Sequence, residues 1–171
     1  MINNKEKIIE YFKSGIKEDK DFRIGIEHEK FLFNTKDNKR IDYPKVKEMF
    51  TALTEFGWNP VFEKENIIGL NKGGKNITLE PGNQIELSGD KLNHMHEACA
   101  ESQDYLFELK QVTKKLDIKI VSAGFDPISK LEDIPKNPKQ RYELMTKDMP
   151  LGGELSLDMM YRTCGTQLNI D

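Results

Sequence analysis

The chain has 171 residues, 37% hydrophobic and 32% charged, which is typical of one soluble globular domain and unlike a disordered chain. Its 26 basic and 29 acidic side chains give a formal net charge of -3, which argues against nucleic acid as a partner because such binding needs a surplus of positive charge. The sequence contains neither a signal-peptide core nor an apolar run of roughly 18 residues, so we expect a cytoplasmic protein without membrane partners.

The start of the chain predicts a helix followed by a strand. Apolar residues recur there at helical spacing: Ile8, Ile9, Phe12 and Ile16. With Asn3 or Asn4 as a cap, this pattern predicts a short amphipathic helix packed on the body of the domain. Residues 23–33 then alternate between polar and apolar, which predicts a strand with Glu27 and Glu29 on one face and His28 on the other.

The next segments predict a second helix and a hairpin. Asp42 is suited to cap a helix with an apolar inner stripe, and Gly57 is placed to end it. Residues 76–80 and 84–88 each alternate between polar and apolar on either side of Pro81-Gly82. This arrangement predicts a hairpin, or one strand bent at the turn.

The second half of the chain predicts two helices and two strands. Residues 90–116 keep a helical rhythm, 118–125 read as a buried strand, 141–149 as a short helix and 159–171 as a final strand. Without regular βαβ alternation, the whole predicts an α+β fold with an antiparallel sheet. One sheet face would lie under helices and the other would line a cavity. Residues 1–171 show no linker or repeat and are expected to belong to a single domain.

Carboxylates on the predicted strands suggest a cation site. Glu27 and Glu29 share a strand face, while Glu80 and Glu86 flank the turn, and Gln84 points the same way as Glu86. Like charges repel unless they are neutralised, so an inward-facing cluster implies bound metal, whereas an outward-facing one is merely solvated. Magnesium suits such an all-oxygen set of ligands better than zinc or copper.

Amides and arginines near the end of the chain are candidates for binding a substrate. Gln167 and Asn169 share a strand face and could orient a substrate or its phosphate, or could lie on a partly exposed edge strand. Arg141 and Arg162 could each hold a substrate carboxylate through two parallel hydrogen bonds. The alternative for each arginine is an ordinary place on the surface.

Other chemistries lack their usual marks. The sequence has no P-loop, no nucleophile elbow and no dinucleotide-binding glycine fingerprint. The three histidines do not share a face with the glutamates or with one another, so none looks like a metal ligand. Cys99 and Cys164 show no zinc-binding spacing and are interpreted as idle thiols, with a regulatory disulfide left open.

Four blocks of the sequence resemble successive segments of glutamate-cysteine ligase of the plant and proteobacterial type. They lie within about residues 20–171 and are IGIEHEKF, ITLEPGNQIELSG, GFDPISKLEDIPKNPKQRYELM and SLDMMYRTCGTQLNID. The resemblance implies a fold similar to glutamine synthetase, that of the carboxylate-amine ligases. In this fold an antiparallel sheet curves around a funnel-shaped site, with helices on its outer face.

The resemblance also implies an activity, the first step of glutathione biosynthesis. ATP would phosphorylate the side-chain carboxylate of glutamate, and the amine of cysteine would attack the acyl phosphate. The implied ligands of Mg2+ on ATP are Glu27, Glu29, Glu80 and Glu86. The implied catalytic residues are Glu27, Glu29 and Arg162. The implied substrate-binding residues are Gln84, Arg141, Arg162, Gln167 and Asn169, of which Gln167 and Asn169 would also contact ATP.

Family members run well beyond 171 residues, so we expect the fold to be incomplete in this chain and the chain alone to be inactive. Two alternatives stay open. The first is another ATP-dependent carboxylate-amine ligase with a different amine acceptor. The second is a non-catalytic fragment that binds magnesium or a partner chain. The sequence does not indicate an oligomeric state.

Overall fold

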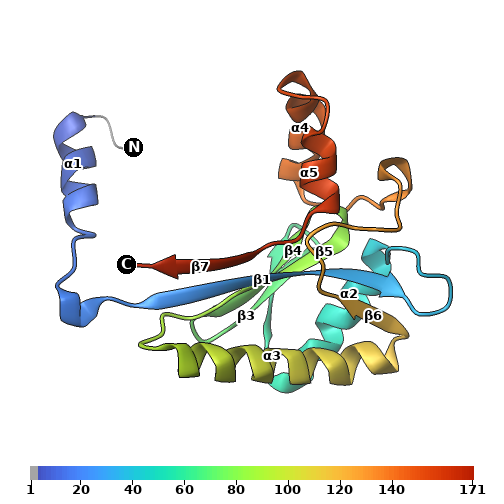
Figure 1. The fold of residues 1–171 in the computed structure, drawn as a ribbon, viewed down its shortest axis with the longest axis horizontal. Coiled ribbons are helices and arrows are strands. Elements are labelled where there is room, and N and C mark those ends of the chain that lie inside the picture. The colour runs from blue at the N-terminus through green and yellow to red at the C-terminus, as the bar shows by residue number, and fades with distance from the viewer. Residues whose placement is uncertain (1–3) are drawn as a thin grey trace.

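The computed structural model describes residues 4–171 and shows an α+β fold built on one open antiparallel sheet (Figure 1). Its strands are β1 (Ile24–Asn34), β2 (Asn59–Glu63), β3 (Asn66–Lys72), β4 (Lys75–Glu80), β5 (Gln84–Ser88), β6 (Ile118–Val121) and β7 (Thr166–Ile170). The strand order is β2-β3-β4-β5-β1-β6, and β7 also pairs with β1. The predicted fold class and antiparallel sheet are confirmed.

The long strand β1 organises the sheet. One side of β1 pairs with β5, and its other side pairs with β7 near the beginning and with β6 near the end. Between these two partners, the backbone N–H of Glu29 donates to the carbonyl oxygen of Gly165 at 3.0 Å. The segment that leads into β7 is therefore fixed to the middle of β1.

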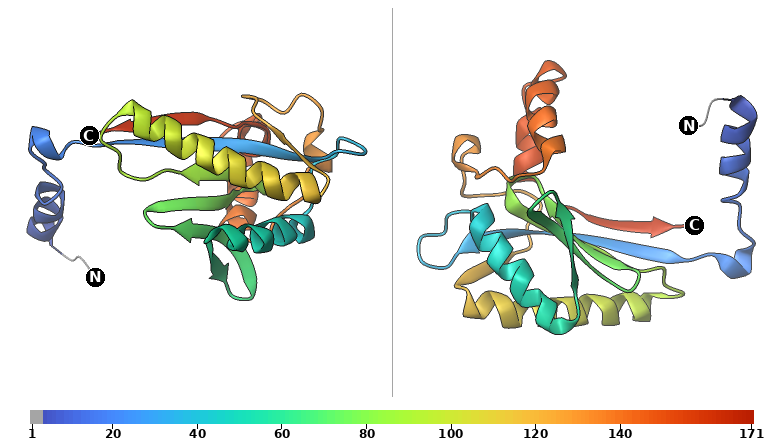
Figure 2. Two further views of the ribbon diagram at one scale, coloured as in Figure 1. Left: turned by 90° about the horizontal axis from the view of Figure 1, so that it is seen from below. Right: turned by 180° about the vertical axis from the view of Figure 1, so that it is seen from behind.

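Helices lie on both sides of the sheet. The helices α2 (Tyr43–Leu53) and α3 (Met95–Lys115) cover one face, whereas α4 (Gln140–Asp148) and α5 (Ser156–Arg162) project from the other side (Figures 1 and 2). As predicted, Asp42 caps α2 by accepting a hydrogen bond from the N–H of Lys45 at 3.1 Å. Gly57 ends the turn that follows α2, in the left-handed conformation with φ 84.

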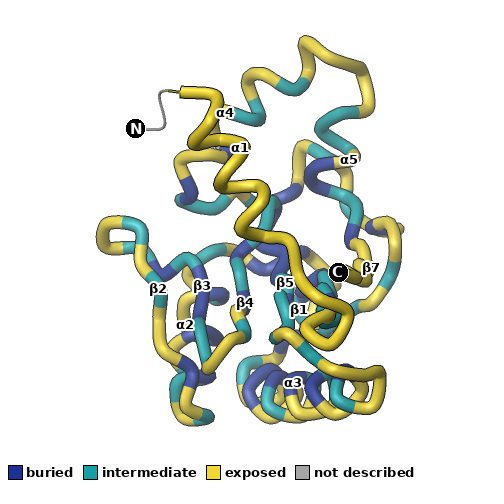
Figure 3. Tube along the Cα trace, turned by 90° about the vertical axis from the view of Figure 1, so that its left-hand side faces the viewer, coloured by how far each residue is buried: buried dark blue, intermediate teal, exposed yellow. Residues whose placement is uncertain are grey.

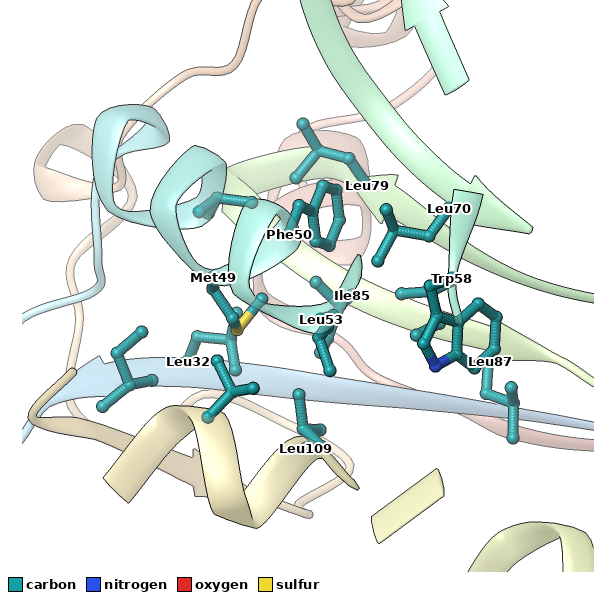
Figure 4. Close-up of a cluster of buried hydrophobic side chains, with 14 of the residues drawn as sticks. Leu32, Met49, Phe50, Leu53, Trp58, Leu70, Leu79, Ile85, Leu87 and Leu109 are labelled. Carbon is teal, nitrogen blue, oxygen red and sulfur yellow. The ribbon is translucent and has the colours of Figure 1, made fainter. Parts of the chain in front are cut away.

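The main core lies between the sheet and the pair α2 and α3. Its fully buried side chains include Leu32, Met49, Phe50, Leu53, Leu70, Leu79, Ile85, Leu87 and Leu109 (Figure 4). Each buried side chain of this size contributes about 1.5–3 kcal/mol to folding. This core holds β4, β5 and β1 in register. The opposite face is polar on β4 and β5, whereas on β1 it is polar at Glu27 and Glu29 and apolar at Phe31 and Phe33, which pack with Cys164 in a second cluster.

The predicted packing of the first helix is wrong. The helix α1 (Lys5–Lys13) has no buried residue (Figure 3) and stands away from the sheet (Figure 1). Phe12 is 73% exposed and Ile16 is 78% exposed. The cap is Asn4, which accepts from the N–H of Lys7 at 2.8 Å, and Asn3 lies outside the described residues. The amphipathic pattern therefore predicted the helix correctly, but the apolar side of the helix packs against no other part of the domain.

Three further expectations need correction. The strands β2 and β3 were not predicted, and the strand expected over 118–125 ends at Val121. Residues 159–162 were expected in the final strand but belong to α5, because Met160 and Tyr161 pack against Ile134 and Tyr142. The strand β7 itself begins only at Thr166. Among residues 4–171, no helix combines the length and apolarity that a membrane crossing requires.

Candidate functional site

The sheet face opposite α2 and α3 carries the predicted glutamates. Glu29 lies opposite Glu86 across β1 and β5, and Glu27 lies opposite Gln167 across β1 and β7. Neighbouring strands are about 4.8 Å apart, and alternate residues of one strand are about 6.7 Å apart. The Cα atoms of Glu27 and Glu29 therefore both lie within roughly 8 Å of the Cα atom of Glu86 across the sheet. Glu80 shares this face one strand further on, diagonal to Glu86. The four glutamates therefore share one face of the sheet.

A hollow of about 230 Å3 opens on this face. It is lined by Glu27, Glu29, Glu86, Gly165, Thr166 and Gln167. Burial raises the pKa of Glu29, and the charges of Glu80 and Glu27 raise it further, although the N–H of Gly165 opposes both. Burial also raises the pKa of Glu86, with the neighbouring glutamates adding to it against a hydrogen bond from Ser88. The hollow therefore favours either protons or a cation.

The donor set of the hollow fits a hard cation. Within residues 4–171, no three acidic, histidine or cysteine side chains are already gathered closely enough to ligate an ion. One oxygen of each carboxylate is held within the chain: Glu27 accepts from the Asn169 amide at 3.1 Å, Glu86 from the Ser88 hydroxyl at 2.6 Å, and Glu29 from the Gly165 N–H. The second oxygen of each carboxylate accepts no hydrogen bond from the described residues, and carboxylate oxygens are ligands that suit Mg2+.

Glu80 is in a different environment from the other three glutamates. It accepts hydrogen bonds from the hydroxyls of Tyr142 at 2.6 Å and Thr78 at 3.0 Å. The cations Lys139 and Arg141 stand 3.9 and 4.0 Å from its carboxylate. Glu80 thus belongs to an ionic cluster beside the hollow and is not among the residues that line it.

The two predicted arginines have different surroundings. The Arg141 side chain is 65% exposed, stacks over the Tyr142 ring at 4.8 Å and is held only loosely by Glu80. Arg162 donates to Asp158 at 2.8 Å and to the carbonyl of Asp126 at 3.3 Å, and it stacks on Phe125 at 4.4 Å. Neither lines the hollow. Arg141 is available for a substrate, whereas Arg162 is already engaged by the protein.

The predicted amides are divided in the same way. Gln167 lines the hollow and donates to Asn169 at 2.7 Å, and Asn169 in turn donates to Glu27. Gln84 shares the face of Glu86, as predicted, but is buried. Its amide donates to the carbonyl of Tyr161 and accepts from the thiol of Cys164, both at 2.9 Å. Gln84 therefore supports the wall of the site rather than its open surface.

Sequence reasoning missed the residues that complete the site. The most important is Gly165, whose N–H faces the carboxylate of Glu29 and whose carbonyl accepts from the Glu29 backbone. Lys139 and Tyr142, which hold Glu80, were also missed. The sequence around Gly165, Cys-Gly-Thr, gave little indication of a role in the site. Its partner Glu29 lies 136 positions earlier in the chain, and no local pattern connects the two.

Neither His28 nor the two cysteines line the hollow. His94 was expected within a helix on a different face from His96, but it caps α3 and the two rings lie 5.9 Å apart. His28 faces away from the glutamates and lies 3.2 Å from the Ser102 hydroxyl of α3. Cys99 and Cys164 are both free, the first exposed and the second buried. Burial raises the pKa of the Cys164 thiol well above its ordinary value, so this group is unreactive.

Residues 23–171 match the family model described as "Glutamate-cysteine ligase family 2". The chain belongs to this family. It is 44% identical over 98% of its length to a chloroplastic glutamate-cysteine ligase of Medicago truncatula, of which the match covers 33%. It is 44% identical to chloroplastic glutamate-cysteine ligase A of Oryza sativa subsp. japonica, and 43% identical to the Arabidopsis thaliana chloroplastic ligase, again over 98% of its length. These matches cover 34% and 32% of those two relatives.

The family membership confirms the resemblance carried by the four sequence blocks, and the relatives are ligases. The chain spans about a third of the length of these curated glutamate-cysteine ligases. The expectation of a cytoplasmic location is wrong, because the relatives named here are chloroplastic.

Proposed function

We propose that this chain forms part of an ATP-dependent glutamate-cysteine ligase, acting in glutathione biosynthesis. The observation that carries the proposal is the gathering of Glu27, Glu29 and Glu86 around one hollow in a chain of this family. The reaction would transfer the γ-phosphoryl group of ATP to the side-chain carboxylate of glutamate, releasing ADP. The amine of cysteine would then attack the acyl carbon and expel phosphate, and the ammonium proton would leave to solvent.

The acidic hollow would hold the cations that accompany ATP. Glu27, Glu29 and Glu86 would supply carboxylate oxygens, with Glu80 beside them as a fourth ligand. Bound Mg2+ would neutralise phosphate charge and align the reacting oxygens. Its positive charge would also favour the ionised form of Glu29 and Glu86, whose pKa is raised by burial and, to a smaller extent, by neighbouring glutamates.

Polar groups near the acidic hollow would position the substrates. Arg141, exposed and weakly held, is the better candidate for the α-carboxylate of glutamate. Gln167 and Asn169 would orient phosphate oxygens from β7, next to Glu27. Arg162 and Gln84 would not contact the substrates. They would hold the backbone of Asp126 and Tyr161, and so stabilise the segments beside the hollow.

We further propose that the complete sheet curves around a funnel-shaped site, as in glutamine synthetase, with α2 and α3 on its outer face. The side of the hollow formed by Thr166 and Gln167 is exposed to solvent in this chain, which spans a third of its relatives' length. Electrostatic stabilisation of a transition state needs fixed donors in a site that excludes water. We therefore expect the 171-residue chain alone to yield no γ-glutamylcysteine.

The test compares Glu29→Gln with the parent sequence in the full-length ligase. This change removes one charge from the hollow without opening a cavity, so the fold should persist while ligation is lost. Phosphate release and dipeptide formation are followed together, with Glu55→Gln on the exposed far side of the molecule as the matched control. Normal turnover in a folded Glu29→Gln enzyme would contradict the assignment. Faster product formation with an amine other than cysteine would show that cysteine is not the preferred acceptor.

A further inference from the structure

Arg40 is a buried cation that lies outside the acidic hollow. It is 7% exposed and follows β1 by a few residues, where it pairs with Phe33 in an isolated bridge. Its guanidinium lies over the ring of Phe31 at 4.7 Å and near that of Phe33 at 5.7 Å. Burial lowers the pKa of Arg40, so the site must supply compensating contacts to keep the charge.

Those contacts come from three separate segments of the chain. Arg40 donates to the carboxylate of Asp126 at 3.0 Å, and to the carbonyl of Gly82 in the β4–β5 turn at 2.5 Å. A longer contact of 3.5 Å reaches the carbonyl of Tyr161 at the end of α5. One guanidinium therefore joins the turn after Glu80 to the segment that precedes β7.

Asp126 reinforces the same junction from the other side. Burial alone would raise its pKa, but the N–H groups of Ser129 and Ile128 and the Arg40 guanidinium hold the pKa of Asp126 below its ordinary value. Its backbone N–H donates to the carbonyl of Arg162 at 2.8 Å, and its carbonyl accepts from the Arg162 side chain. Asp126 thus binds Arg162 of α5 through its backbone N–H and carbonyl, while its carboxylate binds Arg40.

This junction leads directly to the acidic hollow. Tyr161, contacted by Arg40, also accepts from Gln84, and Gln84 binds the thiol of Cys164. The next residue, Gly165, donates its N–H to the carboxylate of Glu29. Segment 161–165 is therefore held at both ends, by Arg40 and Asp126 at one and by Glu29 at the other.

We propose that Arg40 and Asp126 form a positioning pair that holds segment 161–165 so that the N–H of Gly165 faces the carboxylate of Glu29. A buried ion pair is a weak source of stability, because desolvation of both charges offsets their attraction. What this pair supplies is a fixed meeting point for segments that are distant in sequence. Among the described residues, Arg40 and Asp126 form no hydrogen bond with a residue that lines the hollow, and their link to Glu29 runs through segment 161–165.

The test removes the pair without leaving an unpaired buried charge. In the 171-residue chain, Arg40→Met combined with Asp126→Leu is compared with Lys45→Met combined with Glu48→Leu, which removes an ion pair of 2.7 Å on α2. Amide hydrogen exchange is measured at Gly165 and, as a reference for the fold, at the buried strand residue Leu87. We expect exchange at Gly165 to accelerate roughly 10- to 100-fold in the first variant alone, as the loss of a hydrogen bond to a charged group predicts. Leu87 should stay protected in both.

A second readout separates positioning from stability. The second readout is the chemical shift of the Gly165 amide proton at constant pH, which should move when the hydrogen bond to the Glu29 carboxylate is lost. If the double variant does not fold, Asp126→Asn keeps the shape and the acceptor for Ile128 and should loosen Gly165 to a smaller extent. Protection of Gly165 equal to the parent in the folded variant would by itself overturn the proposal.

The consequence of this pair for catalysis rests on the proposed function, but the exchange measurement does not require activity. A rigid Gly165 in the double variant would refute the positioning pair alone. Faster exchange at Gly165 in the double variant, together with a full-length protein that forms no ligation product, would refute only the proposed function.

Discussion

Glu29 and Glu86 lie directly opposite each other across β1 and β5, on the open face of the sheet. A pair of carboxylates in this position repels itself, and each is half buried against protein. Burial and neighbouring acids raise the pKa of both. The core beneath them, where Ile85 and Leu87 are fully buried, fixes this register and so keeps the two carboxylates close to each other.

The first prediction concerns the pH dependence of stability. Without metal at pH 7, we expect the free energy of unfolding of Glu86→Gln to equal that of the parent chain or to exceed it by up to about 1 kcal/mol, a figure that allows for solvent screening. A raised folded-state pKa means that the folded chain binds more protons than the unfolded one, so stability falls as pH rises from the ordinary value of 4.5 through the raised value. Urea unfolding at pH 7 and at pH 3.5 measures the effect.

The advantage of Glu86→Gln should shrink at the lower pH, where both states of the parent are protonated at this position. Glu143→Gln, on the exposed surface of α4, controls for the loss of a charge elsewhere. A parent chain that is more stable than Glu86→Gln at pH 7 would show that the hollow does not carry the repulsion argued here.

The second prediction concerns magnesium. Millimolar Mg2+ should lower the apparent pKa of Glu29 and Glu86 in the 171-residue chain, because the ion binds only the ionised carboxylates. Carbon NMR of labelled glutamate side chains, with and without Mg2+, reports each group separately. Glu65, on the turn before β3, provides a comparison group outside the hollow. Equal shifts at Glu65 and Glu29 would reveal general screening by salt rather than a site.

Much of this face of the sheet could be predicted from the sequence, because strand periodicity alone determines which side chains share a face. The alternation around Glu27 and Glu29 and around Glu86 was enough to place them together. The burial of Gln84 could not be predicted in this way. It depends on Tyr161 and Cys164, about 80 residues further along the chain, which cover it.

The errors have equally specific physical causes. Residues 159–162 form a short apolar run that suits a strand or a helix, and only its packing on Tyr142 decides between them. The strands β2 and β3 contain Pro60 and Gly69, residues that lower strand propensity, and are stabilised by pairing with each other. The first helix followed its pattern, but a hydrophobic stripe does not reveal whether a neighbour exists to cover it.

The third prediction follows from the exposure of α1. Deleting residues 1–14 should leave the free energy of unfolding within about 0.5 kcal/mol of the parent, since no residue of α1 is buried. The deletion keeps Lys17, which is bound to Asp171 at 2.5 Å. Lys17→Met in the undeleted chain tests that contact separately. A loss of several kcal/mol on deletion would mean that α1 packs on the domain in solution.

The last prediction separates Arg141 from Arg162, which the sequence offered as equivalent anchors for a substrate. Arg141→Ala should change the stability of the chain by less than about 1 kcal/mol, since its side chain is 65% exposed and reaches Glu80 only at 4.0 Å. Arg162→Ala should cost about 1–3 kcal/mol, because it removes the hydrogen bonds to Asp158 and Asp126 and the stacking on Phe125. In the full-length ligase, Arg141→Ala should raise the KM for glutamate, and Arg141→Lys should restore it only in part, because an ammonium cannot form the paired hydrogen bonds of a guanidinium. Urea unfolding and steady-state kinetics on the same preparations distinguish the two roles. Equal destabilisation by both alanine variants would contradict the assignment of Arg162 to the wall, and an unchanged KM in Arg141→Ala would remove Arg141 from the substrate site.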